Sequence, residues 1–189
     1  MKLFTSDFHL DHKNILQYSH RPYPSVVEMA GMFIHNTNKL INKGDILYFL
    51  GDWSLNKSAV PLISKINCPV HFIFGNHDKS NRKLITSLDN VVSYGDIIET
   101  HIGPEKTSVT LCHYAMITFN KSHHGALNIH GHSHGDLQES YNRLDVGIDN
   151  AAKLLGEYRP FTEAEVLSQI SRINELYTPM ILDSHHPQR

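Results

Sequence analysis

The sequence is poor in the residues that mark several large protein classes. Its two cysteines, Cys68 and Cys112, form no CxxC pattern, which excludes a disulfide scaffold and a zinc site built on cysteine pairs. Both lie in apolar, strand-like runs, so we expect reduced thiols in the core. No apolar run approaches the roughly 20 residues of a membrane span, and no charged segment followed by an apolar one marks a signal peptide. We therefore expect a soluble, cytoplasmic protein that does not bind membranes.

An excess of charge of either sign is also missing. Lysine and arginine number 17 against 19 aspartates and glutamates, for a formal net charge of −2. Proteins that bind extended nucleic acid present a strongly basic surface, and this balance predicts none beyond a local patch. The single tryptophan, Trp53, offers little for a base-stacking platform. We expect a small molecule as the partner; the oligomeric state stays open.

The order of apolar and polar segments suits one globular domain. With 189 residues, 40% of them hydrophobic, the chain is long enough for a substantial core. We assign residues 1–178 to this domain and residues 179–189 to a C-terminal tail. Short apolar strands alternate with helical stretches in the first half, and the second half is rich in strands. This order favours an α/β fold with two packed sheets and outer helices.

Two helices have clear start signals. Residues 25–41 carry apolar side chains at helical spacing, and Ser25 is suited to cap the N-terminus. The segment 162–177 is amphipathic, and Thr162 with Glu165 three residues later matches a capping box. Both segments are therefore predicted to be helices.

Short apolar runs predict the strands. Residues 2–6, 46–50 and 69–74 are continuous apolar runs, typical of buried strands. Residues 91–102 read as one further strand. Together with 107–113 it forms a hairpin-like unit around the turn sequence GPEK.

Histidine is the abundant exception, with 15 residues. A buried imidazole needs partners on both nitrogens, so a purely structural protein has little use for so many. Polar residues that suit divalent metals follow the predicted strands, at the strand ends where α/β proteins bind ligands. In chain order these are Asp7, His9, Asp52, Asn76, His77, Asp78, His113, His130, His132 and His134.

The spacing of these residues supports one shared site. Asp7 and His9 are two residues apart, as are His132 and His134, and residues two apart in extended chain point the same way. Three glycines adjoin them and allow close backbone approach beside an ion: Gly51, Gly75 and Gly131. Each short pattern alone is weak, but their occurrence in order after successive strands predicts a metal site.

The ordered set resembles the calcineurin-like metallophosphoesterase family. Its five blocks are Asp7-Phe8-His9, Gly51-Asp52, Gly75-Asn76-His77-Asp78, His113 and Gly131-His132-Ser133-His134. Four further stretches, HLDHKNI, RPY, VGID and YRP, resemble the small stand-alone phosphoesterases of prokaryotes and their viruses. The resemblance implies a fold of two facing mixed sheets flanked by helices.

It also implies a centre of two divalent metal ions. Asp7, His9, Asp52 and His134 would hold one ion. The other ion would be held by a set that shares Asp52 as a bridge: Asp52, Asn76, His113 and His132. The mixed nitrogen and oxygen ligands fit Mn²⁺ or Fe²⁺ well, and Zn²⁺ or Ni²⁺ could occupy the same site, so ligand type alone does not decide the metal. We expect Mn²⁺.

The resemblance assigns further roles beside the metals. His77 would protonate the leaving oxygen of a phosphate ester, and Asp78 would orient the His77 ring. His12, Asn14 and Arg21 are candidates to line the substrate pocket; the alternative is that they are solvated loop residues.

Departures from known branches narrow the expected reaction. Protein phosphatases of this family carry an arginine before GNH, where this chain has Phe74. Purple acid phosphatases carry a tyrosine where it has Leu55. The missing arginine clamp favours phosphodiesters over monoesters, and the nearly neutral, compact chain suits a small nucleotide as the substrate. The alternatives are a phosphomonoesterase, a nuclease on short single strands, and a scaffold that retains the fold without catalysis.

Overall fold

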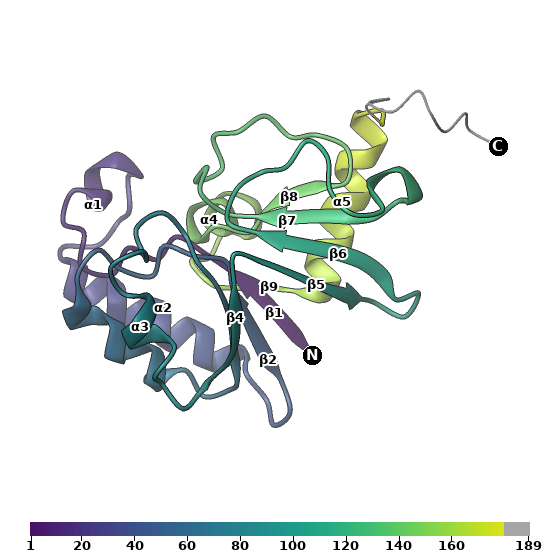
Figure 1. Cartoon of the computed structure of the whole chain (residues 1–189). Coiled ribbons are helices and arrows are strands. Elements are labelled where there is room, and N and C mark those ends of the chain that lie inside the picture. The colour runs from purple at the N-terminus through teal and green to yellow at the C-terminus, as the bar shows by residue number, and fades with distance from the viewer. Residues whose placement is uncertain (180–189) are drawn as a thin grey trace.

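The structure, a computed structural model, describes residues 1–179, so most of the predicted tail at 179–189 lies outside the described residues. Two sheets face each other (Figure 1). The first has the order β4-β3-β2-β1-β9. Its strands are β1 (Lys2–Thr5), β2 (Ile46–Phe49), β3 (Val70–Ile73), β4 (Val91–Gly95) and β9 (Phe161–Thr162).

The second sheet has the order β5-β6-β7-β8. Its strands are β5 (Ile97–Ile102), β6 (Thr107–Cys112), β7 (Leu127–His130) and β8 (Arg143–Asp145). In the first sheet β1 to β4 run parallel and β9 runs antiparallel to β1. In the second, β5 is antiparallel to β6 while β6, β7 and β8 are parallel. Both sheets are mixed, which confirms the predicted α/β fold.

Helices flank the sheets. The first sheet is covered by α2 (Val26–Leu40) and α3 (Arg82–Ile85), with the 3₁₀ segment η1 (Lys57–Lys65) beside them (Figure 1). Helix α5 (Glu163–Leu176) packs on β1, β8 and β9. The remaining elements are α1 (Ile15–Tyr18), η2 (Ser122–His124) and α4 (Ile148–Leu155). No helix within residues 1–179 combines the length and the hydrophobicity of a membrane span.

Both predicted helix caps are confirmed. The Ser25 hydroxyl accepts a hydrogen bond from the Glu28 amide at 3.2 Å at the start of α2. At α5 the Glu165 amide donates to the Thr162 hydroxyl at 3.2 Å, and the Thr162 amide donates to the Glu165 carboxylate at 2.9 Å. This reciprocal pair satisfies two amides that the first turn leaves without partners.

The segment 91–102 is divided between the two sheets, so the prediction of one continuous strand is wrong. Residues 91–95 form β4 beside β3, and residues 97–102 form β5 beside β6. Alternating side chains suit both halves, and only the pairing partners separate them. The hairpin of β5 and β6 is present as expected, and both cysteines are free and buried.

One core cluster fixes the first predicted metal loop. Phe8 lies between Asp7 and His9 and is fully buried. Its ring centroid lies 5.1 Å from that of Phe33 in α2 and 4.9 Å from that of Phe49 in β2. Burying a phenylalanine side chain contributes about 1.5–3 kcal/mol to stability, so this contact anchors the loop to the core.

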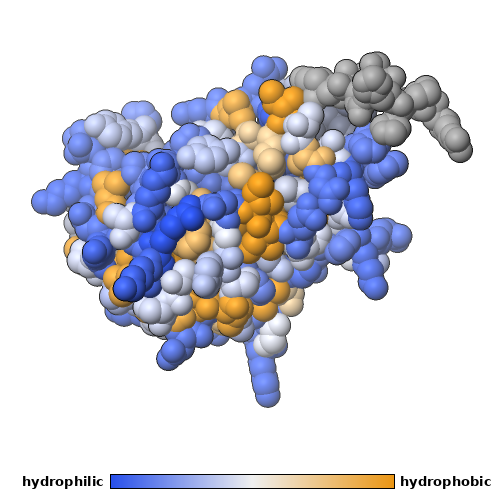
Figure 2. All heavy atoms as spheres, in the orientation of Figure 1, coloured by the Kyte–Doolittle hydropathy of each residue, from blue (hydrophilic) through white to orange (hydrophobic). Residues whose placement is uncertain are grey.

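A second cluster fills the space between the sheets and α5, and includes Phe4, Leu50, Ile129 and Ile170. On the face of the molecule seen in Figure 2, hydrophobic residues lie in separate groups bordered by hydrophilic residues. The edge strands β4 and β5 contribute exposed apolar side chains at Val92 and Ile97.

Candidate metal centre

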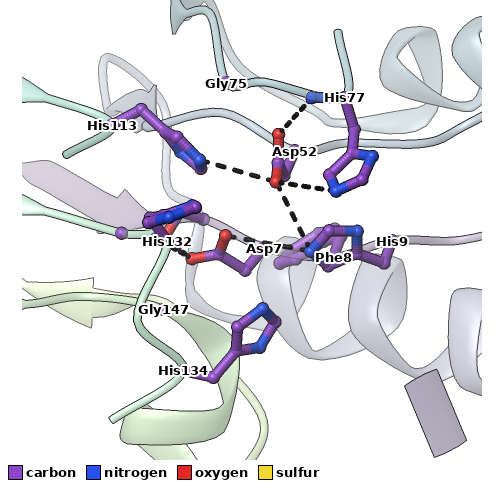
Figure 3. A network of polar contacts seen from close by, with 12 residues as sticks. Asp7, Phe8, His9, Asp52, Gly75, His77, His113, His132, His134 and Gly147 are labelled. Carbon is purple, nitrogen blue, oxygen red and sulfur yellow. Dashed lines mark hydrogen bonds and ion pairs between the residues drawn. The ribbon is translucent and has the colours of Figure 1, made fainter. Parts of the chain in front are cut away.

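The predicted ligands converge where strands of both sheets end (Figure 3). Each lies within four residues of the end of a strand, so the two facing sheets bring them to one place. The first sheet contributes Asp7 and His9 after β1, Asp52 after β2, and Asn76 with His77 after β3; the second contributes His113 after β6, and His132 with His134 after β7.

Asp52 lies at the middle of this cluster. Its Oδ2 atom is 3.6 Å from Nε2 of His9, 3.5 Å from Nε2 of His113 and 3.9 Å from Nε2 of His77. Asn76 lies beside His113, with its Oδ1 atom 3.1 Å from the His113 Nε2. A carboxylate between imidazoles on both sides is what a bridging ligand requires.

Three groups of side chains have ligand atoms within 4.8 Å of one another. One is Asp7, His9 and His134; another is Asp52, His113 and His132; the third is His9, Asp52 and His77. The first two fall within the two predicted ligand sets. The residues therefore have the spacing to hold metal ions.

The backbone at these residues is unusual. Residues other than glycine seldom have positive φ angles, and strain of this kind gathers at functional sites. Five residues of the predicted ligand sets have them: Asp7 at 61°, His9 at 49°, Asp52 at 61°, His132 at 69° and His134 at 50°. The fold thus keeps these residues in an unfavourable backbone conformation that directs their side chains towards one another.

The adjoining glycines permit the close approach that the sequence predicts. A Cβ atom on Gly75 would lie 2.1 Å from Oδ1 of Asp52, and one on Gly131 would lie 2.6 Å from Oδ2 of Asp7. Real Cβ atoms essentially never come within 3.0 Å of another heavy atom. Both loops therefore reach the carboxylates only because no side chain intervenes.

Buried atoms without partners test whether this site fits a metal. In residues 1–179, Oδ1 of Asp7 and Nε2 of His9 are buried and have no hydrogen-bond partner, although they lie 3.9 Å apart. An unsatisfied buried polar group costs about 1–3 kcal/mol. A divalent cation between them would satisfy both, so the donor set fits a metal.

The pKa values of these groups show how strongly they interact. Burial alone raises the pKa of Asp52, but the hydrogen bond and charge of His113 outweigh it and hold that pKa at about 2. Burial lowers the pKa of His113, and Asp52 and Asp7 more than offset this, raising it to about 9. Burial raises the pKa of Asp7 to about 7. A metal ion would compete with protons for the same lone pairs.

Asp78 does not perform its predicted role. Its buried carboxylate accepts backbone hydrogen bonds from Asp52 at 2.7 Å, Gly75 at 2.8 Å and Trp53 at 3.1 Å. These bonds tie the loop after β2 to the loop after β3. The prediction that Asp78 orients the His77 ring is therefore wrong, because its oxygens serve the backbone.

His77 lies at the open side of the cluster. Its side chain is 40% exposed, and its ring centroid is 5.2 Å from that of His9. The His77 amide donates a 2.9 Å hydrogen bond to Oδ1 of Asp52. The residue is thus fixed through its backbone while its ring faces solvent beside the central carboxylate.

The three predicted substrate residues have different surroundings. His12 is partly exposed, with its ring centroid 6.1 Å from that of His9. Asn14 is exposed, and its amide lies 3.5 Å from the Tyr18 hydroxyl. The placement of Arg21 in a substrate pocket is wrong, because its side chain is fully buried. Of the three, His12 is the one whose partly exposed ring lies beside a predicted ligand.

Two residues that the sequence did not single out lie against predicted ligands. Asp149, in the first turn of α4, lies with Oδ2 2.6 Å from Nδ1 of His134. Tyr114 follows His113 and is 46% exposed, with its ring centroid 4.8 Å from that of His132. The VGID stretch contains Asp149 and was the one available signal for it.

Comparison with known proteins gives the relatives of this chain. No family model matches it. It is 34% identical, over 140 residues, to the uncharacterized protein MJ1445 of Methanocaldococcus jannaschii, which covers 72% of this chain and 70% of that protein. A crystal structure of the protein of unknown function AQ665 from Aquifex aeolicus matches with a TM-score of 0.67. That match has 21% identity, covers 90% of this chain and 99% of the other, and shows the fold alone. The extent of the first match places this chain in the same family as the uncharacterized protein MJ1445.

Proposed function

We propose that this protein is a metal-dependent phosphoesterase that hydrolyses phosphodiesters of small nucleotides. The observation that carries the proposal is the position of Asp52 between two groups of ligand atoms. A carboxylate so placed suits a pair of divalent cations, and the resemblance to calcineurin-like metallophosphoesterases assigns it that role. We propose Mn²⁺ as the metal, since carboxylate, amide and imidazole ligands suit it.

The residues divide between two ions. Asp7, His9 and His134 would hold one ion; Asn76, His113 and His132 would hold the other; Asp52 would contact both. When bound, two such cations activate a water molecule and offset the charge on the phosphoryl oxygens. The buried ring of Phe8 and the backbone hydrogen bonds to the Asp78 carboxylate keep the ligand loops in place.

His77 is the candidate proton donor. Its exposed ring lies beside Asp52, with 3.9 Å between Nε2 and Oδ2, so it can meet an ester that enters from solvent. A protonated His77 would transfer its Nε2 proton to the leaving oxygen, a step that contributes about 10²–10⁴-fold in rate. The amide bond to Oδ1 of Asp52 keeps this ring beside the ligand that both ions would share.

The preference for diesters rests on what surrounds the centre. The position before Gly75 is Phe74, which is buried and provides no charge to bind the second negative charge of a monoester. Tyr114 instead presents an exposed ring beside His132 and His113. Aromatic rings stack on nucleobases with about 1–3 kcal/mol per base. A nucleotide diester lacks the second negative charge that an arginine would bind, and its base can stack on the Tyr114 ring.

Hydrolysis of two model esters tests the proposal. Protein stripped with a chelator and refilled with Mn²⁺ is assayed with bis-p-nitrophenyl phosphate and p-nitrophenyl phosphate, beside His77→Ala and the matched control His35→Ala. His35 is an exposed histidine on α2. We expect manganese-dependent turnover of the diester that falls about 10²-fold or more in His77→Ala with its metal content unchanged, and full activity in His35→Ala.

Two results would count against parts of the proposal. Faster hydrolysis of the monoester would refute the diester preference, but the proposed phosphoesterase activity would stand. Metal-loaded protein that turns over neither ester, with any of Mn²⁺, Fe²⁺, Zn²⁺ or Ni²⁺, would refute the activity in favour of a scaffold that binds metal.

A further inference from the structure

A buried ion pair joins the segment between α1 and α2 to helix α4. Arg21 and Asp149 meet through two hydrogen bonds of 2.8 Å, from Nε to Oδ1 and from Nη2 to Oδ2. The Arg21 side chain is fully buried and that of Asp149 is 8% exposed. A buried ion pair is weak evidence for stability, because the desolvation of two charges offsets much of their attraction. Its other contacts therefore indicate what it does.

The remaining arginine donors bind the loop that carries Asp7 and His9. Nη2 donates to the Asp7 carbonyl at 2.6 Å, and Nη1 donates to the Phe8 carbonyl at 2.7 Å. Nη1 also lies 3.4 Å from the sulfur of Met29. The two carbonyls belong to consecutive residues in a loop with positive φ at Asp7 and His9. A rigid guanidinium that binds both carbonyls holds this strained loop in one conformation.

The aspartate of the pair contacts a predicted ligand on the other sheet. Oδ2 of Asp149 lies 2.6 Å from Nδ1 of His134, and the Ser19 hydroxyl lies 3.4 Å from the same nitrogen. A carboxylate that accepts the Nδ1 proton leaves Nε2 as the free lone pair of the ring. Carboxylates of this kind orient metal-binding histidines and raise their basicity.

We infer that Arg21 and Asp149 are positioning residues for one of the two ions, the ion held by Asp7, His9 and His134. Three hydrogen bonds leave the pair and reach the Asp7 carbonyl, the Phe8 carbonyl beside His9, and the His134 ring. The pair therefore acts on Asp7 and His134 directly and on His9 through its neighbour Phe8. No such contact from the pair reaches Asn76, His113 or His132 in the hydrogen bonds of residues 1–179. The effect is therefore selective for one site. This inference rests on the metal centre of the proposed function.

The two residues of this pair belong to two of the four further stretches that resemble small phosphoesterases. RPY contains Arg21, and VGID contains Asp149. Tyr23 of RPY and Tyr158 of YRP pack against each other, with ring centroids 5.5 Å apart. Tyr23 also packs against Phe33, and Phe33 packs against Phe8 in the loop that carries Asp7. Three short stretches that are distant in the sequence thus pack around this loop.

Metal titration of Asp149→Asn tests the selectivity. Stripped wild-type protein and the variant are titrated with Mn²⁺ by calorimetry, with bound metal counted by elemental analysis. We expect the wild type to bind two ions. In the variant the affinity for one ion should fall about 10–100-fold, while the affinity for the other ion should stay within about threefold of the wild-type value. Glu165→Gln is the control, because it removes an ion pair with Arg159 away from the centre; both affinities should stay.

Two further measurements separate positioning from general stability. Arg21→Lys keeps the positive charge but loses the planar guanidinium, so it should lower the affinity for the same ion. The double variant should bind that ion only slightly more weakly than either single variant. In Zn²⁺-loaded wild type, long-range ¹H–¹⁵N spectra should show His134 protonated at Nδ1. This spectrum needs no variant and is informative even where a substitution impairs folding.

The outcomes are distinct. Variants that bind both ions like the wild type, or a His134 protonated at Nε2 in the Zn²⁺ form, would refute the positioning role alone. Equal loss at both sites would refute its selectivity. A wild-type chain that binds no ion would refute the metal centre itself.

Discussion

The substitution Gly75→Ala should displace Asp52, the carboxylate at the middle of the histidine cluster. The added Cβ would lie 2.1 Å from Oδ1 of Asp52 and 2.7 Å from its amide nitrogen, whereas ordinary contacts begin at 3.4 Å. The carboxylate must therefore retreat by more than 1 Å or the two loops must separate. Its hydrogen bond from the His77 amide and its position between His9 and His113 would both be lost.

Gly31→Ala provides the matched control, since it adds the same methyl group in α2 with no atom within 4 Å. In the metal-free protein, overpacking at residue 75 should lower the free energy of unfolding by about 1–3 kcal/mol. The helical control should raise it by about 0.5–1 kcal/mol. Chemical denaturation and Mn²⁺ calorimetry measure both effects. Wild-type affinity for two ions in Gly75→Ala would refute the argument that this close approach sets the position of Asp52.

Three further changes follow from the contacts described. Asp78→Asn should lower the free energy of unfolding by about 2–3 kcal/mol, because the carboxylate accepts three backbone bonds; a loss under 0.5 kcal/mol in urea melts would contradict this. Arg159 and the α5 cap lower the pKa of Glu165 to about 2, so its contribution is present above pH 4.5 and is lost as pH falls towards 2. After discounting for solvent exposure, Glu165→Gln should remove about 1 kcal/mol at pH 7 and little at pH 2, and equal losses in denaturation at both pH values would refute the assignment. Tyr114→Ala should raise KM for a nucleotide diester about tenfold with Mn²⁺ affinity unchanged, and an unchanged KM would exclude stacking on this ring.

The positions of the predicted ligands were accessible from sequence because the fold brings them together in a simple way. Asp7, Asp52 and His113 each follow an apolar strand directly, and parallel strands bring such positions to one edge. Glycines at 75 and 131 marked the close approaches that the structure contains. The two sheets and the caps at Ser25 and Thr162 likewise depended on local patterns.

Features that depend on distant partners were less accessible. Arg21 resembled an exposed cation in a polar loop, and only its encounter with Asp149, 128 residues away, buries it. Asp78 follows His77 in sequence, but its carboxylate faces backbone amides of another loop. The strand pattern of 91–102 gave no sign of the transfer between sheets. In each case the local pattern suited two environments, and tertiary contacts selected one.

Metal binding and turnover, measured together, test whether hydrolysis depends on the proposed pair of metal ions. Stripped protein is titrated with Mn²⁺ while bound metal and hydrolysis of bis-p-nitrophenyl phosphate are followed in the same samples. We expect two ions per chain and a rate that rises with the doubly loaded form. Turnover that persists in stripped protein with chelator present, or a chain that binds no ion, would contradict this expectation.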